Sequence, residues 1–186
     1  VKVAGDGRYH IHELLRQFAG EILKTDPHTR SAVRARHSAY YLDFLYRLSE
    51  PILGGRQREA AAEIAAELDN IRVAWQWAVQ HQQVEAAGRA VVALSMFCQI
   101  RSRYLDASRM YEHALGGLDF SGLDQQLIRA QILLEMGWTG WQIGEPHLQL
   151  GMTLNRSLDR KLKDILMGCH YESAYQLDDK HLDHIL

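Results

Sequence analysis

The sequence predicts an all-α protein, a right-handed solenoid of antiparallel helix pairs that follows a short N-terminal β-hairpin. From His12 onward, apolar residues recur about every 3.6 positions, which is the period of an amphipathic helix. Only three prolines occur among the 186 residues, so long stretches lack helix-breaking residues. The segments between the predicted helices are short, as antiparallel helix pairs require.

Composition restricts the classes of protein that the chain can represent. Apolar residues make up 47% and charged residues 24% of the chain, which is typical of a globular protein and excludes a largely disordered one. The formal net charge of −2 provides no general attraction to nucleic acid or acidic lipid. No apolar run reaches the roughly 18 residues of a membrane span. The two cysteines, Cys98 and Cys169, lie in apolar stretches and indicate inert core thiols in a reduced, cytoplasmic protein.

The first eleven residues are the part of the chain with the alternation of a β-strand. Val1 and Val3 alternate with polar residues, Gly5 and Gly7 suit a tight turn, and Tyr9 resumes the alternation. A single hairpin is marginally stable in water. We therefore expect it to belong to a larger domain whose remainder lies outside this chain.

The apolar stripes then predict nine helices in order. The first carries Leu15, Phe18 and Ile22 on one face, and the segment Thr25-Asp26-Pro27 ends it. The second helix carries an apolar stripe and stops before Pro51; its stripe is Val33, His37, Tyr40, Tyr41, Phe44 and Leu48. The stripe of the third is Ala60, Ile64, Leu68, Ile71, Trp75 and Val79, and that of the fourth is Ala87, Val91, Leu94 and Cys98. The fifth has the stripe Leu105, Ser108, Tyr111 and Leu115 and is closed by Gly116 and Gly117; the sixth to eighth are expected at 124–141, 147–158 and 161–177, and the ninth begins near Lys180.

Weak internal repeats support this series of helix pairs. Gln99-Ile100 recurs as Gln142-Ile143, and a further shift of about 34 residues, the tetratricopeptide period, aligns Gln142 with Gln176. Small residues recur where two helices would cross closely, with large residues beside them. The sequence therefore predicts tetratricopeptide-like repeats, the last of them truncated.

Two segments carry a family resemblance. RYHIHELLRQFA at 8–19 resembles the end of the winged-helix domain in NB-ARC-type signal-transduction ATPases of the STAND class, and ELDNIRVAWQWA at 67–78 resembles the start of the helical repeats in their bacterial members. HSAYY at 37–41 fits the helix between them. The resemblance implies the end of a winged-helix domain at 1–25, linking helices at 26–82 and tetratricopeptide-like repeats at 83–186.

The resemblance also implies a function for the intact protein. Many such relatives are LuxR-type or antibiotic-regulator-type transcriptional activators, and Ile11-His12-Glu13 occupies the place of a methionine-histidine-aspartate motif whose histidine contacts the nucleotide phosphate in the ADP-bound state. This assigns nucleotide sensing to His12 in a full-length ATPase that binds ATP and ADP. The alternative is that His12 only begins a helix.

The chain itself is not expected to be an enzyme. The phosphate-binding pattern G-x-x-x-x-G-K-[ST] is absent from the sequence, so we expect no ATP hydrolysis and no bound cofactor in this region. No Ser-His-Asp motif and no paired-carboxylate pattern stands out, so we predict no catalytic residue, and the spacing of the histidines predicts no metal site. His12 and Glu13 begin an H-E-x-x-H pattern, but Arg16 stands where the second histidine is required.

The expected role is protein interaction. Trp77 and Trp138 each lie two or three positions from another tryptophan, so one of each pair can face a groove, although core packing is the simpler interpretation. Arg101 and Arg103 are suited to a carboxylate contact. We therefore predict a protein or peptide partner, or a small inducer, on the repeat surface, with self-assembly and without direct contact to nucleic acid or membrane. A stand-alone tetratricopeptide scaffold that binds peptide segments is the alternative.

Overall fold

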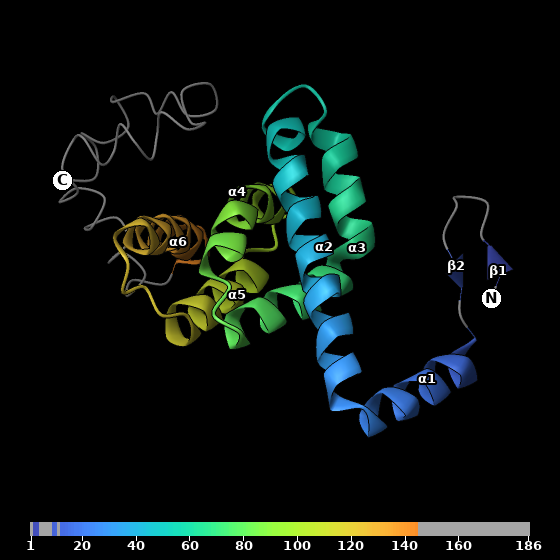
Figure 1. Ribbon diagram of the computed structural model, residues 1–186. Helices are drawn as coiled ribbons and strands as arrows, with labels where there is room; N and C mark the ends of the chain where they lie inside the picture. Colours follow the sequence, from blue (N-terminus) through green and yellow to red (C-terminus); the bar gives the residue numbers. More distant parts are fainter. Residues whose placement is uncertain (1, 4–8, 11, 145–186) are drawn as a thin grey trace, which may run out of the picture. The chain divides into compact units, whose positions relative to one another are not determined.

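The computed structural model describes residues 2–3, 9–10 and 12–144, and these form two short strands and six helices (Figure 1). The expectation of a mainly helical protein is confirmed. Strands β1 (Lys2–Val3) and β2 (Tyr9–His10) pair in antiparallel fashion, with Lys2 opposite His10. The glycines assigned to the turn between them, and the helices predicted after residue 144, lie outside the described residues.

The junction between the first two helices follows the sequence signals closely. Helix α1 (Glu13–Thr25) ends at the predicted position, and α2 (Pro27–Leu53) begins at once. Proline suits the first position of a helix because its missing N–H would have no intrahelical partner there. Asp26 caps the new helix, since its Oδ1 accepts a hydrogen bond from the Thr29 backbone N–H at 3.0 Å.

The expectation that the second helix stops before Pro51 is wrong, because α2 continues through Pro51 to Leu53. Proline removes only its own backbone hydrogen bond, which would reach the Arg47 carbonyl. The hydrogen-bond ladder resumes immediately afterwards, where the Gly54 N–H donates to the Glu50 carbonyl at 3.0 Å. A proline in the last turn therefore disturbs too little of the helix to end it.

The buried face of α2 also differs from the predicted stripe. Tyr40 is 59% exposed and Val33 is exposed as well, although both were expected on the packed side. The buried residues follow a neighbouring face and include a serine: Ser38, Leu42, Leu45, Leu48 and Ile52. The predicted stripe was built from large apolar residues. Ser38 is buried because α3 comes close to α2 there, and the small side chain leaves room for the hydrogen bond to the Ala74 carbonyl.

The next four helices agree with the predicted third to sixth: α3 (Gln57–Gln80), α4 (Val84–Ile100), α5 (Tyr104–Gly117) and α6 (Leu123–Ile143). One predicted core position in them is wrong. Leu105 is 59% exposed, and Ala107 and Met110 are buried on α5 instead. The buried face of α5 therefore begins at Ala107, two residues after Leu105. The size of a side chain alone pointed to Leu105, but the smaller Ala107 is the residue in contact with the core.

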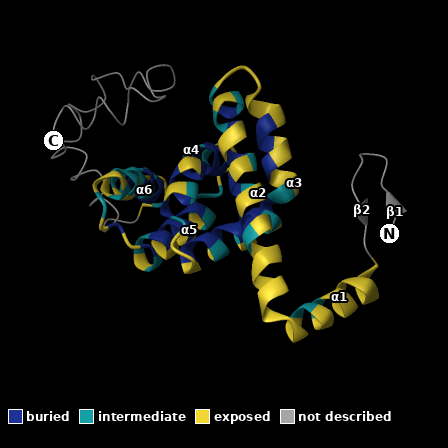
Figure 2. Cartoon of the chain, in the orientation of Figure 1, coloured by how far each residue is buried: buried dark blue, intermediate teal, exposed yellow. Residues whose placement is uncertain are grey.

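Contacts divide the chain into two units, Val1–His37 and Ser38–Leu186. The boundary lies inside α2, twelve residues beyond the boundary at 25 that the resemblance implies. In the first unit α1 has no buried residue. Figure 2 shows α1 almost entirely in the colour of exposed residues, whereas buried residues concentrate among α3, α4, α5 and α6 in the second unit.

Within the second unit, successive helices reverse direction and alternate helices run parallel. Ser38 Oγ donates to the Ala74 carbonyl at 2.8 Å and Tyr41 Oη to Glu67 Oε2 at 3.1 Å, which sets α2 antiparallel to α3. Arg72 pairs with Asp106 at 3.0 Å and Trp75 Nε1 donates to the Met110 carbonyl at 3.0 Å, so α3 and α5 run parallel.

Helices α4 and α6 run parallel in the same way. Gln125 Nε2 donates to Glu85 Oε1 at 3.2 Å near their first turns, and the Ser95 hydroxyl donates to the Glu135 carboxylate farther along. Both pairs are 40 residues apart, so residues at this spacing lie at the same level. In the sequence, Gln99-Ile100 recurs as Gln142-Ile143, a spacing of 43 residues. The contacts between α4 and α6 join residues 40 apart, so the structural spacing is shorter by nearly one helical turn.

Two glycines allow the helices of this unit to approach closely. A methyl group added at Gly88 would lie 2.8 Å from side-chain carbons of Ile128, so α4 and α6 touch there. A methyl group at Gly117 would overlap Cγ1 of Val79, so the end of α5 lies against α3. Glycine in a helix costs about 1 kcal/mol relative to alanine, and close packing explains its presence at both positions.

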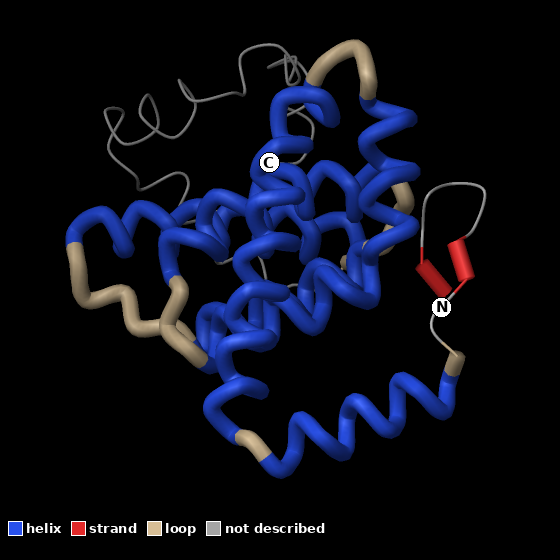
Figure 3. The backbone as a smooth tube through the Cα atoms, turned by 45° about the vertical axis from the view of Figure 1, so that its right-hand side comes forward, coloured by secondary structure: helices blue, strands red, loops and turns tan. Residues whose placement is uncertain are grey.

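Short linkers precede and follow α4, and Figure 3 draws the loops between the helices in tan. These two linkers share one backbone feature. Gln82 has a φ of 56° and Ser102 a φ of 52°, both in the left-handed region. The next residue closes the turn in each: the Gln83 N–H donates to the Ala78 carbonyl at 2.9 Å, and the Arg103 N–H donates to the Cys98 carbonyl at 2.7 Å. The same three-residue turn therefore reverses the chain twice, which is structural repetition that residue identities do not show.

Candidate functional site

His12, the residue assigned to nucleotide sensing, is the N-cap of α1. Its backbone is extended, and its Nδ1 accepts a hydrogen bond from the Leu14 N–H at 3.3 Å. The side chain is exposed to solvent. The helix-starting role that the sequence left open is therefore present, and the nucleotide role stays a prediction.

Glu13, which stands at the acidic position of the same motif, is held by its own helix. Arg16 Nε donates to Glu13 Oε2 at 2.8 Å, and Gln17 Nε2 donates to Oε1 at 2.9 Å. These hydrogen bonds, that from Arg16 first, lower the pKa of Glu13 below its usual value. The carboxylate of Glu13 is thus engaged along α1, with Arg16 and Gln17 as its hydrogen-bond partners.

Trp77 is half-buried and stacks on His81 one turn later in α3. The ring centroids are 3.5 Å apart with an interplanar angle of 17°. Nδ1 of His81 lies 2.9 Å from the Trp77 carbonyl, which fixes the imidazole over the indole. The Trp77 Nε1 is buried and has no hydrogen-bond partner among the described residues. One face of this predicted partner-binding residue is therefore already covered by the chain itself.

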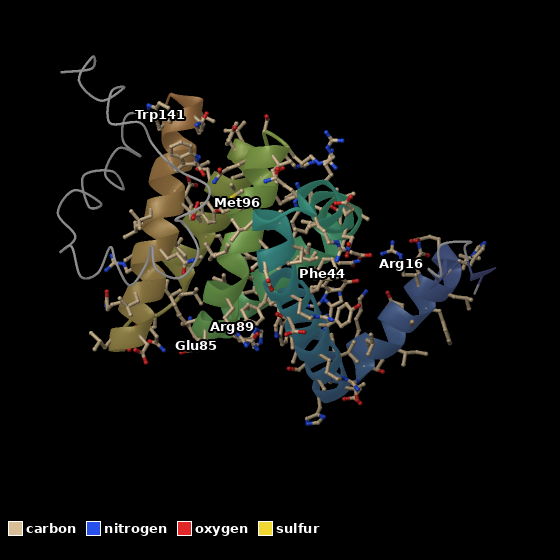
Figure 4. The ribbon with its side chains drawn as sticks, turned by 90° about the horizontal axis from the view of Figure 1, so that it is seen from above. Arg16, Phe44, Glu85, Arg89, Met96 and Trp141 are labelled. Carbon is tan, nitrogen blue, oxygen red and sulfur yellow. The ribbon has the colours of Figure 1, made fainter. Side chains whose placement is uncertain are left out.

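Trp138 is half-buried on α6 and lies against Trp141, with ring centroids 5.2 Å apart and tilted by 44°. Trp141 is 51% exposed, and Figure 4 shows it near the end of α6. The more accessible tryptophan is thus the one that the predicted site omitted. The three-residue spacing revealed a shared face, but it did not distinguish the inner residue from the outer one.

The two arginines predicted to bind a partner differ in their surroundings. Arg101 is exposed, whereas Arg103 is half-buried and its Nε donates to Asp106 Oδ2 at 2.6 Å. Arg72 reaches the other oxygen of Asp106 at 3.0 Å. The carboxylate contact expected for this arginine cluster therefore exists within the chain, as an Arg72–Asp106–Arg103 triad that joins α3 to α5.

The four predicted partner-binding residues do not form one site. Trp77 lies near the linker that begins α4, and Arg101 and Arg103 lie at its other end, about 25 Å away for a helix of 17 residues. The parallel register of α4 and α6 places Trp138 level with Cys98, at the end where Arg101 lies. In Figure 4, Glu85 and Trp141 likewise lie at opposite ends of this pair of helices.

A buried polar cluster that no sequence pattern predicted lies where α4, α5 and α6 meet. Glu135 is 6% exposed, Ser95 and Tyr111 are fully buried, and the Ser95 hydroxyl donates to the Glu135 carboxylate. Gln99 Nε2 donates to Ser95 Oγ at 3.4 Å. Acidic residues are almost never fully buried unless they are paired. Ile132 and Thr139 share the buried face of α6 with Glu135, but a glutamate in a helix is nearly always exposed, so the residue type itself argued against a buried position.

The Tyr111 hydroxyl belongs to this cluster but has no hydrogen-bond partner among the described residues. Burial raises the pKa of Tyr111 well above its usual value, the Glu135 carboxylate and the Cys98 thiol raise it further, and the nearby Ser95 hydroxyl opposes this slightly. The hydroxyl therefore stays protonated. Ser95 lies close enough to influence the pKa but not in the geometry of a hydrogen bond.

Cys98 is buried as the sequence predicts. Burial, and then the negative charge of Asp106, raise the pKa of its thiol to about 12, although Arg103 and Arg72 oppose the increase. Since the thiolate is the nucleophilic form, this cysteine is chemically inert in the folded chain. Cys169 lies outside the described residues.

No family model, curated protein or solved structure matched the chain in comparisons with each of the three sets. Among the residues that the structure describes, no helix is both long enough and apolar enough to cross a membrane.

Proposed function

We propose that the chain is the non-catalytic regulatory and protein-interaction region of a STAND-type ATPase, a cytoplasmic transcriptional regulator of the LuxR or antibiotic-regulator type. Residues 1–25 are the end of its winged-helix domain, residues 26–82 link this domain to the repeats, and residues 83–186 are tetratricopeptide-like. The repeats receive a protein, a peptide or a small inducer and control assembly, while ATP and ADP bind to the full-length parent.

The observation that carries this proposal is the alternation of helices in the second unit. Helices α3 and α5 run parallel, as do α4 and α6, and each of α3 and α6 contacts both helices of the α4–α5 pair. In a helical-repeat array every repeat contacts its neighbours in this manner, and the array presents a long surface along its side. The contact pattern supports a repeat array independently of the sequence resemblance.

The exposed end of α4 and α6 is the part of this surface best suited to a partner. Trp141 is half-exposed beside Trp138, and the guanidinium of Arg101 lies free of ion pairs within the described residues. Tryptophan and arginine are the residue types that most often dominate the binding energy of protein interfaces. A partner that offers an apolar side chain next to a carboxylate fits this end.

The alternative function is a stand-alone scaffold that binds peptide segments, and the same tryptophan and arginine residues favour it. The reading frame that precedes Val1 distinguishes the two. A phosphate-binding loop upstream supports the regulator, and an upstream start codon without such a loop supports the scaffold. This test depends only on the encoded sequence.

The role of His12 is tested in the full-length protein by replacing His12 with aspartate. Aspartate is among the best N-cap residues, so α1 keeps its start, but its negative charge repels a phosphate. We expect the affinity for ADP to fall at least about tenfold, the scale of a lost hydrogen bond to a charged group. The control is His28→Asp, at an exposed histidine in the first turn of α2. Unchanged ADP affinity in His12→Asp contradicts the nucleotide role.

A further inference from the structure

We infer that residues 27–37, the first part of α2, bind the phosphates of double-stranded DNA, with the helix lying in the major groove. This segment belongs to the first unit of the chain. It carries Arg30, Arg34 and Arg36 and contains no aspartate or glutamate. The inference goes beyond the proposed function, which assigns partner binding to the repeats, and either can fail without the other.

The three arginines of this segment are exposed, and none of them forms an ion pair within the described part of the chain. Elsewhere arginines do pair with acids of the same helix: Arg16 with Glu13, and Arg47 with Asp43. Figure 2 shows the first half of α2 in the colour of exposed residues. The charges of the three arginines are therefore available to a ligand.

The arrangement of these arginines does not stabilise the helix that carries them. Arg30 and Arg34 are four positions apart, so two positive charges lie next to each other on one face, which is destabilising. Arg30 also lies close to the start of α2, where the helix dipole disfavours a positive charge. The adjacent acid, Asp26, accepts the Thr29 N–H as the helix cap. Residues that conflict with local stability are expected at functional sites, so a ligand explains the cluster better than the fold does.

The arginines lie on two sides of the helix. At 3.6 residues per turn, Arg34 and Arg36 are about 200° apart around the helix axis, so they lie on nearly opposite sides. Every residue from 27 to 34 is exposed, which leaves the helix accessible all round. A flat acidic surface, on a protein or on a membrane, contacts one side of a helix. Two rows of phosphates, one on each side, contact both.

The major groove of B-form DNA offers such an arrangement, because a phosphate backbone runs along each of its edges. The groove is about 12 Å wide and admits an α-helix, whose diameter with side chains is about 10–12 Å. The guanidinium group of arginine forms paired hydrogen bonds with phosphate oxygens. The major groove of double-stranded RNA is narrow and deep, and side chains do not read it. Duplex DNA is therefore the polyanion that fits arginines on both sides of one helix.

The net charge of the chain conceals this segment. The formal charge of the whole chain is −2, which led us to expect no contact with nucleic acid. Exposed charges act over a distance of about 8–10 Å at physiological ionic strength, so an average over all residues does not describe the field around one helix. The attraction to phosphates is therefore local to residues 27–37.

Fluorescence anisotropy of a labelled DNA duplex of about 20 base pairs and mixed sequence, titrated with the full chain, tests the inference. Three phosphate contacts predict that the affinity falls about 40-fold when the salt concentration rises from about 50 to about 200 mM. Replacing Arg30, Arg34 and Arg36 together with glutamine should weaken binding at least about tenfold at the lower salt concentration and remove most of the salt dependence.

Single variants test the two-sided contact. Arg34→Gln and Arg36→Gln should each lower the exponent of the salt dependence by about one, although the two residues lie on opposite sides of the helix. Glutamine is a good helix former, and circular dichroism checks that each variant keeps its helix content. If the triple variant loses helix, the single variants provide the same test.

The matched control replaces three exposed arginines on other helices with glutamine: Arg58 on α3, Arg109 on α5 and Arg129 on α6. This control changes the net charge of the chain by the same amount as the triple variant. Its affinity for the duplex should stay within about threefold of that of the parent, because the attraction is local.

Four results overturn the inference. The first is absence of duplex binding at about 50 mM salt. The second is equal weakening by the control variant, which shows that overall charge attracts the DNA. The third is unchanged binding by Arg36→Gln, which shows contact on one side only. The fourth is competition by a glutamate-rich peptide as strong as that by unlabelled duplex of equal charge, which shows that the partner is an acidic protein.

Discussion

The side chain of Gln82 holds the end of α5 by hydrogen bonding to the Gly117 backbone: Gln82 Nε2 donates to the Gly117 carbonyl at 2.7 Å. Its Oε1 accepts from the Asp119 N–H, also at 2.7 Å. One amide thus satisfies a donor and an acceptor of the chain as it leaves α5. These hydrogen bonds are accompanied by backbone strain at Gln82 itself, because its φ is 56°, a conformation that non-glycine residues seldom adopt.

Comparison of Gln82 with Ser102 separates the backbone strain from the hydrogen bonds. The two residues share the left-handed conformation, but within the described part of the chain the Ser102 side chain makes no hydrogen bond. Ser102→Gly should therefore stabilise the protein by about 1 kcal/mol through relief of strain. Gln82→Gly relieves the same strain but loses two hydrogen bonds, so it should be neutral or destabilising by up to about 1 kcal/mol. Urea denaturation measures both, and equal stabilisation by the two variants would show that the Gln82 bonds contribute nothing.

Gly116 and Gly117 should respond oppositely to alanine. A methyl group at Gly117 collides with Val79, whereas nothing lies within 4 Å of one at Gly116. We expect Gly117→Ala to lower the free energy of unfolding by about 1–3 kcal/mol and Gly116→Ala to raise it by about 0.5–1 kcal/mol through higher helix propensity.

The double variant Gly117→Ala, Val79→Ala identifies the cause of the loss at position 117. Val79→Ala vacates the space that the new methyl group needs, so the two substitutions should be less destabilising together than the sum of their separate effects. Thermal or chemical denaturation of the four proteins provides this comparison. Strict additivity would place the strain of Gly117→Ala somewhere other than at Val79.

The protonation of Asp106 should make the free energy of unfolding depend on pH. Burial raises its pKa, but the hydrogen bond from Arg103 and the positive charges of Arg72 and Arg103 outweigh burial, so the pKa falls below its usual 3.8. A carboxyl group with a lower pKa in the folded chain stabilises the fold above its unfolded pKa and loses that contribution as the pH falls through the folded pKa.

Asp106→Asn should therefore destabilise the protein by about 0.5–1 kcal/mol near neutral pH, the scale of partly exposed ion pairs. The deficit should shrink below about pH 4 as the parent protonates. Urea denaturation across this pH range measures it, with Asp69→Asn as the control, because the Asp69 side chain is 96% exposed. A deficit that stays constant down to about pH 2 would indicate lost packing in place of lost charge.

Cys98 should resist alkylation in the native protein. Its pKa of about 12 leaves almost no thiolate at about pH 8, and its side chain is buried. In a Cys169→Ser background, iodoacetamide should label Cys98 at the rate of unfolding or partial opening and rapidly only in denaturant. Labelling of the native protein as fast as a free thiol would contradict the buried placement of Cys98.

The sequence by itself determined the helical class and most of the helix boundaries that lie within residues 12–144. The 3.6-residue period, Asp26-Pro27 and the Gly116-Gly117 pair are local signals, and capping and backbone preferences act within a few residues, so they can be read without the fold. The same local logic failed at Pro51, because the effect of a proline depends on how much helix remains after it.

Only the tertiary structure decided which face of each helix is buried and which residues meet. Leu105 and Tyr40 are exposed although they are large and apolar, while Ser38, Ser95 and Glu135 are buried, because their positions are set by the neighbouring helix and not by their own hydrophobicity. The Arg72–Asp106 pair joins residues 34 positions apart, and the Ser95–Glu135 hydrogen bond joins residues 40 positions apart. Pairing over such distances depends on the register between helices, and that register comes from close contacts such as Gly88 against Ile128, which no local pattern encodes.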